Sequence, residues 1–506
     1  MKILSDLEYL KLNRWQKAWY KIKRFFISIP NKFKNFFIKI GLFFKKIFVK
    51  IGNEFKDVWL TFKNGDWKTR TSFFVMGFGN IARGQIFRGI LFLLFEIVFF
   101  LFIILWGGYY IGKLGSLGEL ASKVEMVLDP VTGLEVETTV YYDNSFKILL
   151  YAIMSIIFII AFIYTWRLNV KQNKLAQSII DSGKKLKSGK DDLHSLVDDQ
   201  FHKSLLALPL FGIIVFTVLP ILFMILIAFT NYDMDHTPPA NLFTWVGLDN
   251  FNELFKWSAN GANFSATFGE ILSWTLIWAI FATFTNYFLG MLVAMLINKK
   301  GIRFKKLWRT ILVITIAVPQ FISLLYVSKM FANDGIINGF LRNIGLDALP
   351  FWTDKTWARV TVIIINIWIG IPYLMLITTG ILMNIPKDLY ESAKIDGANG
   401  FQQYMKITLP YMLFVTGPYL LTSFINNMNN FNVIYLLTGG APSSTSLTGG
   451  AGHTDLLVTW LYKLTIDNSN YKLAAVIGIM VFVVVAIISL IVYNFMPSTK
   501  NEEDYQ

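Results

Sequence analysis

Long apolar runs separated by short polar segments dominate the pattern of this chain. Each run is near or above the ~20 residues that an α-helix needs to cross the hydrocarbon of a bilayer. A charge at mid-bilayer costs roughly 2.5–3.5 kcal/mol, and four of the runs contain none. The pattern predicts an all-α polytopic membrane protein with eight transmembrane helices, at 87–110, 147–166, 204–229, 271–297, 307–328, 357–382, 411–438 and 473–496.

The segment before the first run alternates lysines with aromatic residues, for example Lys32, Phe33, Lys34, Phe36 and Phe37. This spacing predicts a basic amphipathic helical extension that lies on the headgroups of an anionic leaflet, so membrane lipid is an expected partner. A solvated tail that only helps to set topology is the alternative. Residues 1–86 carry 18 Lys/Arg against 5 Asp/Glu, so the net charge of +14 belongs to one end and gives no reason to expect nucleic acid.

Basic residues in the short loops indicate the orientation of the spans. The segment 298–309 has six Lys/Arg and no acid, and 167–203 has eight Lys/Arg, whereas 107–146 and 230–270 are acidic. We therefore expect a multi-pass protein of the plasma membrane whose N- and C-termini are both cytoplasmic.

Composition excludes several classes of protein. Only 16% of the residues are charged, against about 25% in soluble domains, which argues against a disordered chain or a cytosolic enzyme. The chain has no cysteine, and its four histidines are not at metal-ligand spacing, so no metal site is expected. A G-x-x-x-x-G-K-[ST] phosphate loop is also missing, so any ATPase must be another chain.

One polar segment between two spans, 384–410, has clear helix signals. Pro386 can open a helix, and Asp388 and Glu391 suit its positive end. Gly397 can close that helix in a left-handed cap, and Pro410 precedes the next apolar run. The prediction is a helix–turn–helix knob that faces the cytoplasm.

The spacing in this knob resembles the EAA loop of permease subunits of ABC importers. The matching residues are Glu391-Ser392-Ala393, Asp396-Gly397-Ala398 and Ile407-x-Leu409-Pro410, with Ser392 in place of the family's alanine. In that family the loop docks into a cleft of the ATPase. The resemblance therefore implies that the ATPase contact includes Glu391, Ala393, Asp396 and Gly397. An ordinary loop with a glycine cap is the alternative.

Further segments resemble the large permease subunit of maltose and maltodextrin importers (MalF type), and 70–96 resembles versions from low-GC Gram-positive bacteria. These segments are 366–373, 425–442 and 450–460. The resemblance implies the type I ABC importer fold and four kinds of partner: a second permease subunit of the MalG type, two copies of an ABC ATPase that binds ATP and Mg, an extracellular sugar-binding lipoprotein and an oligosaccharide. No cofactor is expected in this chain.

The expected organisation has four parts. Residues 1–86 form the basic N-terminal region, and 87–203 form two accessory transmembrane helices with a cytoplasmic loop. Residues 204–498 form the core permease domain with six transmembrane helices and the EAA loop at 384–410, and 499–506 form a cytoplasmic tail.

A polar stripe in the 411–438 run is the candidate sugar site. Ser423, Asn427 and Asn430 recur at helical spacing, and amides both donate to and accept from hydroxyl groups. Pro372 interrupts the hydrogen bonds of the 357–382 run, a break that suits backbone lining a cavity. By resemblance, the residues that contact sugar are Ile369, Gly370, Tyr373, Ser423, Asn427 and Asn430. Hydrogen bonding between helices of the permease pair is the alternative for the stripe.

The sequence thus predicts a non-catalytic permease of an ATP-driven importer that carries oligosaccharides, most of all maltose and maltodextrins, by alternating access. Raffinose-type or other oligosaccharides are alternative substrates. An ion-coupled secondary transporter would need intramembrane acids, and only Glu96 is available, which we expect to be neutral or paired. A membrane-embedded enzyme would have to use Asp233, Asp235 and His236, for which a loop turn is the better explanation.

Overall fold

The structure of the chain is a computed structural model that describes residues 16, 38, 41–43, 45–128, 133–186, 191, 194, 197, 198, 201–256, 263–299 and 301–495. Residues 1–44 of the expected N-terminal region, apart from 16, 38 and 41–43, and the expected C-terminal tail at 499–506 lie outside the described residues. The chain divides into two compact units, one of Met1–Tyr109 with Met154–Gly212 and one of Tyr110–Ile153 with Ile213–Gln506.

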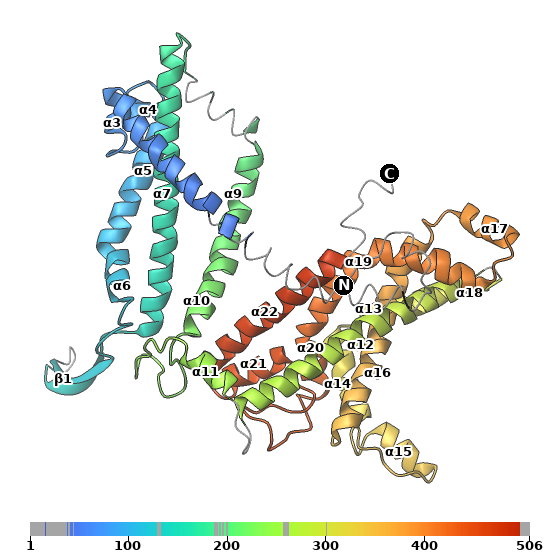
Figure 1. Ribbon diagram of the computed structural model, residues 1–506. Coiled ribbons are helices and arrows are strands. Elements are labelled where there is room, and N and C mark those ends of the chain that lie inside the picture. The colour runs from blue at the N-terminus through green and yellow to red at the C-terminus, as the bar shows by residue number, and fades with distance from the viewer. Residues whose placement is uncertain are drawn as a thin grey trace. The chain divides into compact units, whose positions relative to one another are not determined.

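Within the described residues, seven helices are long and apolar enough to cross a membrane, and a bent helix pair brings the number to eight. This confirms the expected polytopic helical fold. Figure 1 labels their parts, which are α5 (Ile86–Phe102) with α6 (Gly108–Lys113), α7 (Ser145–Asp181), α9 (Phe201–Ile213) with α10 (Leu219–Ile227), α12 (Phe264–Asn298), α13 (Lys305–Ala317) with α14 (Gln320–Met330), α16 (Lys355–Leu382), α18 (Gly400–Gln403) with α19 (Leu409–Met428) and α20 (Phe431–Leu437), and α22 (Tyr471–Phe495).

Shorter elements connect or flank these spans. Two π-helical turns, Ile214–Val218 and Tyr404–Thr408, each stand directly before a helix that has a proline in its first turn. A proline cannot donate to the carbonyl four residues back, and a wider turn accommodates that loss. A third π-helical turn, Ile103–Gly107, lies between α5 and α6. The remaining short helices are α3 (Trp67–Thr71), α4 (Phe78–Ile81), α11 (Asp249–Phe255), α15 (Ile336–Asn343), α17 (Lys387–Ile395) and α21 (Leu457–Ile466).

The run at 307–328 is not one unbroken helix, and in this respect the expectation of a simple span is wrong. The axes of α13 and α14 meet at 92°. Val318, which separates them, is extended (φ −77°, ψ 126°), as is usual for a residue that precedes a proline. Pro319 then forms the N-cap of α14. The proline therefore converts a predicted span into a sharp corner.

A β-hairpin is an addition to the all-α expectation. Strand β1 (Ser122–Leu128) pairs antiparallel with β2 (Glu135–Tyr141), in a register that runs from Ser122 opposite Tyr141 to Leu128 opposite Glu135. The hairpin lies in the segment between α6 and α7. Alternating valines and charged residues in both strands suit a two-stranded ribbon that is largely exposed.

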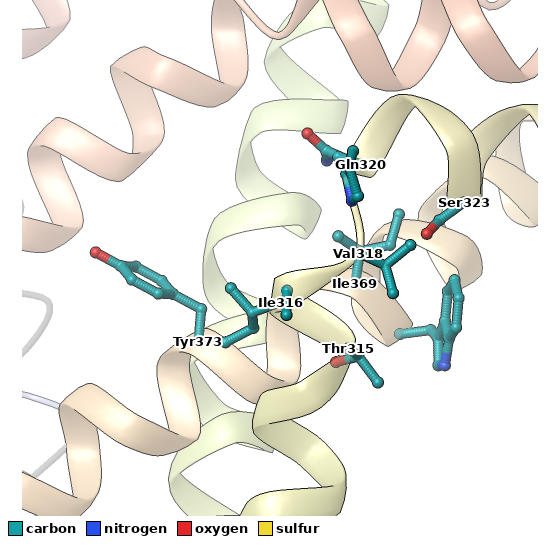
Figure 2. Close-up of a pocket in the computed structure, with 10 residues that line it drawn as sticks. Thr315, Ile316, Val318, Gln320, Ser323, Ile369 and Tyr373 are labelled. Carbon is teal, nitrogen blue, oxygen red and sulfur yellow. The ribbon is translucent and has the colours of Figure 1, made fainter.

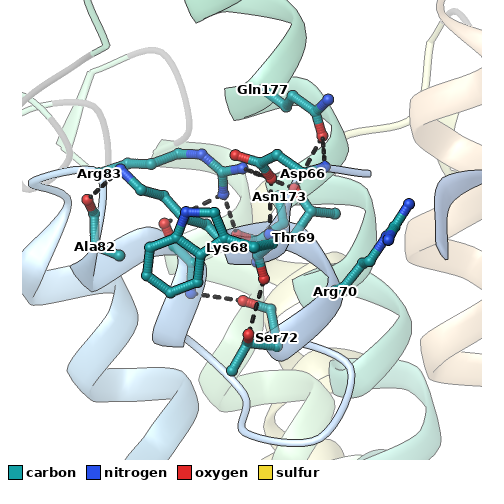
Figure 3. Close-up of polar contacts among 12 residues, drawn as sticks. Asp66, Lys68, Thr69, Arg70, Ser72, Ala82, Arg83, Asn173 and Gln177 are labelled. Atoms are coloured by element: carbon teal, nitrogen blue, oxygen red, sulfur yellow. Dashed lines mark hydrogen bonds and ion pairs between the residues drawn. The ribbon is translucent and has the colours of Figure 1, made fainter. Parts of the chain in front are cut away.

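In the first unit, a buried arginine joins α3 to α7 (Figure 3). The side chain of Arg83 is 1% exposed, and its Nη2 lies 2.6 Å from Asp66 Oδ1 and 2.7 Å from Thr69 Oγ1. Its Nη1 donates to Asn173 Oδ1 at 2.9 Å. Because the guanidinium is fixed and always charged, these contacts hold three segments of the chain in one arrangement.

Glu96 lies in α5 and is 8% exposed. Its Oε2 accepts a hydrogen bond from the backbone N–H of Met76 at 2.8 Å. The carboxyl group thus satisfies a buried backbone donor in the turn before α4. This contact supports a structural interpretation of Glu96 rather than a proton relay.

In the second unit, α12 packs along α16 and α19 through clusters of buried apolar side chains, with a glycine at a point of close approach. Gly290 lies so close to α16 that a Cβ on it would be 2.6 Å from the Cβ of Leu374. Near the other end, Trp274 Nε1 donates to the carbonyl of Thr454 and Trp278 Nε1 donates to that of Asn427. Small residues permit such close helix contacts in membranes, and the indole bonds join α12 to the end of α19 and to the loop before α21.

The arginine cluster predicts a measurable loss of stability. Replacing Arg83 by methionine leaves Asp66, Thr69 and Asn173 without their shared donor, and breaking a buried ion pair in this way costs about 3–5 kcal/mol. Asp66 is partly exposed, so the lower end of that range is expected. Thermal unfolding of the purified chain in detergent should show a clear drop in midpoint for Arg83→Met. The exposed Lys56→Met serves as the control, and an equal midpoint for both variants would refute this role.

Candidate functional site

A cavity of about 330 Å³ lies at the corner between α13 and α14, against the middle of α16. Ile369 and Tyr373, two of the predicted sugar-contact residues, line it one helical turn apart. Figure 2 shows Ile369 beside Val318, with Gln320 and Ser323 from the start of α14 around it, while the hydroxyl of Tyr373 points away from that corner. The full lining is Thr315, Ile316, Ala317, Val318, Pro319, Gln320, Ser323, Trp368, Ile369 and Tyr373.

The chemistry of this lining is neutral. It offers two aromatic rings, three hydroxyl groups and one amide, and it contains no Asp, Glu, Lys, Arg or His. Aromatic rings pack against apolar C–H faces, and amides and hydroxyls both donate and accept hydrogen bonds. The cavity therefore suits an uncharged, hydroxyl-rich ligand better than an ion.

The residues of the α13–α14 corner were missed by the sequence analysis. A usable signal was present, because Pro319 and Gln320 interrupt an otherwise apolar run. A proline next to a polar residue in a span indicates backbone that faces a cavity or another helix. The interruption at Pro372, by contrast, leaves α16 continuous from Lys355 to Leu382.

Gly370 faces away from this cavity, toward α12. A Cβ on Gly370 would lie 2.2 Å from Asn286 Nδ2, closer than any real side-chain carbon stands. Gly370 is therefore a position of close helix packing. Next to it are two buried amide atoms without hydrogen-bond partners, Asn286 Oδ1 and Asn366 Nδ2. These asparagines were also absent from the sequence-based candidates, although both stand in apolar runs where an amide is costly.

The predicted polar stripe of Ser423, Asn427 and Asn430 does not lie on one continuous helix. Asn427 Nδ2 donates to Thr283 Oγ1 on α12 at 3.0 Å, so this amide joins two helices of the same chain. The helix α19 ends at Met428, and Asn430 is the N-cap of α20, where its side chain accepts from the Val433 N–H. The expectation of one continuous helical stripe through Asn430 is therefore wrong.

Ser423 lies on α19, one turn after Tyr419, and is not among the residues that line the cavity. The structure thus places two of the six predicted sugar-contact residues, Ile369 and Tyr373, at the cavity. It assigns Gly370, Asn427 and Asn430 to helix packing and capping.

The segment 386–410 forms the predicted helix–turn–helix knob. Helix α17 starts after Pro386, and Gly397 closes it with φ of 77°, in the left-handed region. The N–H of Ala398 donates to the carbonyl of Ala393 at 2.8 Å, which is the six-residue closure typical of a glycine-capped helix. Helix α18 then begins with a capping box of Asn399 and Gln402.

The knob has an exposed surface that mixes charges with apolar side chains. Glu391, Asp396 and Gly397 are exposed, and Ala393 is half-buried. Ile395, which stands between them, is 88% exposed, and Leu389 and Phe401 are also exposed. These three apolar residues were not among the sequence-based candidates.

Charged residues outside the spans connect loops. The carboxylate of Asp233 lies 2.7 Å from Lys472 Nζ and 2.7 Å from His236 Nδ1. Burial alone would raise the pKa of Asp233, but Lys472 and His236 outweigh it and hold that pKa below its ordinary value. The pair joins the loop after α10 to the start of α22. Among the described residues there is no group of three or more His, Cys, Asp or Glu that could hold a metal ion.

A multi-helix membrane chain with a neutral cavity at a broken helix and an exposed knob between two spans has the organisation of a transport permease. Residues 286–501 match the family model described as binding-protein-dependent transport system inner membrane component. The chain belongs to this family, as the following relatives also show.

The galactooligosaccharides transport system permease protein GanP of Bacillus subtilis (strain 168) is 38% identical over 367 residues, 72% of this chain and 86% of that protein. The maltodextrin transport system permease protein MalC of Streptococcus pneumoniae serotype 4 is 34% identical over 441 residues, 85% of this chain and 95% of that protein. The maltose/maltodextrin transport system permease protein MalF of Escherichia coli (strain K12) is 36% identical over 266 residues, 52% of this chain and 51% of that protein. These matches confirm a membrane permease rather than an enzyme.

The contact of α12 with α16 predicts a position-specific effect of adding one methyl group. Gly370→Ala forces a carbon toward Asn286, and overpacking of this kind costs about 1–3 kcal/mol. Gly380→Ala is the matched control, because a Cβ at Gly380 on the same helix meets no atom within 4 Å. Thermal unfolding in detergent should separate the two variants, with Gly370→Ala alone destabilised. Similar unfolding midpoints in the two variants would show that the close packing at Gly370 does not contribute to stability.

Proposed function

We propose that this chain forms half of the translocation pathway of an ATP-driven importer for oligosaccharides, with maltose and maltodextrins as the main substrate class. The observation that carries this proposal is the match to a maltodextrin permease over 85% of this chain and 95% of that relative. The neutral, aromatic-bearing cavity at the α13–α14 corner supports an uncharged sugar. A galactooligosaccharide is the second candidate, because a permease of that name is 38% identical.

Within this pathway, we assign sugar contact to Ile369, Tyr373 and Ser423, together with Gln320 of the α13–α14 corner. Tyr373 is 52% exposed, so its ring is free to stack on the apolar face of a pyranose. Gly370, Asn427 and Asn430 shape the pathway indirectly, through the packing and capping described above. The separation of these roles is itself testable, since contact residues change substrate affinity and packing residues change stability.

The knob is proposed as the contact with the ATPase. Glu391, Ala393, Asp396 and Gly397 lie on or beside one turn, with the exposed Ile395 among them. A protruding aliphatic residue ringed by charges suits a cleft on a partner. The proposed assembly contains a second permease subunit, two ATPase copies that bind ATP and Mg, and an extracellular sugar-binding lipoprotein. The knob and both termini then face the cytoplasm of the cell.

Substrate contact is tested at Tyr373. Replacing Tyr373 by alanine removes one stacking surface, and a loss of ~1.4 kcal/mol corresponds to roughly a tenfold rise in the sugar concentration needed for half-maximal uptake. Uptake of labelled maltotriose and of a galactotriose by cells that carry each variant measures this and ranks the two substrates. Tyr326→Ala is the control, since Tyr326 is an exposed tyrosine on α14 outside the cavity lining. If uptake by Tyr373→Ala depends on sugar concentration as it does in the unaltered protein, Tyr373 does not contact the sugar.

Coupling to the ATPase is tested at the knob. Gly397→Val places a β-branched residue at φ of 77°, whereas asparagine tolerates that conformation, so Gly397→Asn is the matched control. We expect Gly397→Val and the charge reversal Glu391→Lys to lower sugar-stimulated ATPase activity of the reconstituted assembly at least tenfold, with membrane insertion intact.

Full sugar stimulation of ATPase activity in both Gly397→Val and Glu391→Lys would show that the knob does not couple the permease to the ATPase. Solute accumulation by the chain alone in liposomes, without any nucleotide-hydrolysing partner, would overturn the proposed function as a whole.

A further inference from the structure

The helix over residues 45–64 is fixed on α7 by a dense set of ion pairs. Arg167 lies 2.6 Å from Glu54 and 2.5 Å from Asp57. Lys171 and Lys174 add pairs to the same two acids, at 3.0 Å and 2.5 Å. These pairs join the helix to α7 within the first unit, and two spaces lie beside the contact.

One of these spaces is a basic cavity of about 600 Å³ between the helix and α7. Five cations and two acids line it, and both acids are already engaged by Arg167, Lys171 and Lys174. Within the described residues, Lys45, Lys46 and Lys50 make no ion pair. The complete lining is Leu42, Lys45, Lys46, Val49, Lys50, Asn53, Glu54, Asp57, Arg167 and Lys171.

Arg167 also lines this cavity, with its Nε and Nη2 paired with Glu54 and Asp57. These two acids are thus neutralised by α7, and Lys45, Lys46 and Lys50 give the cavity an excess of positive charge with free N–H groups. This combination is the chemistry that recognises a phosphate.

The second space is an apolar groove of about 520 Å³ that shares Lys50, Glu54, Arg167 and Lys171 with the basic cavity. The two spaces therefore adjoin. Beyond these shared residues, the groove has an almost wholly apolar lining, which consists of Ile51, Phe55, Val58, Ile160, Ile163, Tyr164 and Trp166.

The sequence of α7 places this pair of spaces at the edge of the hydrocarbon layer. The apolar part of α7 ends at Trp166, and Arg167 is its first charged residue after Lys147. At 37 residues, α7 is about 55 Å long, whereas the hydrocarbon is about 30 Å thick, so α7 continues beyond it. Ile160 and Ile163 then lie at hydrocarbon depth, and Arg167 and Lys171 lie at headgroup depth.

We propose that this junction is a binding site for one anionic phospholipid. The lipid phosphate binds to Lys45, Lys46 and Lys50, and an acyl chain lies in the groove lined by Phe55, Ile160 and Ile163. A free phosphate or an acidic peptide would satisfy the basic cavity alone. Only a lipid also fills the adjoining apolar groove at the depth where α7 meets the headgroups. This site is independent of the sugar pathway, and its test does not rely on transport.

The test uses the full chain purified in a neutral detergent, and native mass spectrometry counts the bound lipids. The variant Lys45→Gln/Lys46→Gln/Lys50→Gln is compared with Lys56→Gln/Lys63→Gln/Lys185→Gln, which removes the same charge from exposed lysines outside both spaces. Each protein is titrated with phosphatidylglycerol, with phosphatidylcholine and, in a separate arm, with phosphatidylglycerol plus inorganic phosphate.

We expect the unaltered chain and the control to retain one phosphatidylglycerol that the cavity variant loses, with an apparent affinity at least about tenfold lower for three lost lysines. Phosphatidylcholine binding should be equal in all three proteins, and millimolar inorganic phosphate should not displace the lipid. Equal phosphatidylglycerol retention by the cavity variant and the control would overturn the proposal. Displacement by inorganic phosphate would show a phosphate site without a lipid.

A second variant keeps the charges and fills the groove. Ile163→Trp adds a ring where the acyl chain is expected, and it should weaken phosphatidylglycerol binding as well. Ile104→Trp, at an exposed apolar position on the span that starts at Ile86, is its control. Undiminished binding in Ile163→Trp would exclude the groove as the seat of an acyl chain, even if the lysine variant behaves as expected.

Discussion

The close approach of α12 to α16 is the constraint on which the second unit depends. The two helices approach this closely where one of them has a glycine, at Gly290 opposite Leu374 and at Gly370 opposite Asn286. Lipid offers no hydrophobic drive for helices to associate, so tight packing and hydrogen bonds such as that of Asn427 to Thr283 must supply the attraction. The cavity residues Ile369 and Tyr373 are positioned because their helix is held on its other side.

The same helix connects the two places to which we assign function. The C-terminal end of α16 leads through a short turn into α17, so Tyr373 and the start of the knob at Pro386 belong to nearly continuous structure. The other end of the knob continues through the π-helical turn into α19, where Ser423 and Asn427 lie. The Tyr390 hydroxyl lies 2.9 Å from that of Thr408 and connects the two arms. A displacement of the knob would therefore act on α16 and α19 together.

How much the sequence could predict differs from element to element. The spans and the left-handed cap at Gly397 follow from local rules, namely apolar length and backbone sterics, and both were predicted correctly. The corner at Pro319 was not predicted, because a hydropathy average over the run hides the break that Pro319 and Gln320 signal. The end of α19 before Asn430 and the partner of Asn427 depend on tertiary packing, which spacing along one helix does not contain. In the cluster around Arg83, the arginine binds Asn173, which is 90 positions away in the sequence. No local sequence pattern predicts such a contact.

The outward-facing Ile395 has a consequence for the life of the protein before assembly. The side chain of Ile395 is 88% exposed and that of Phe401 is 72% exposed. A copy of the subunit without partners therefore has an exposed apolar surface on the knob. Such a surface is a ready target for chaperones and proteases, which act on exposed apolar segments. Cells that make this subunit in excess of its partners should accordingly degrade the excess. The amount of the subunit then follows the amount of the partner that binds the knob.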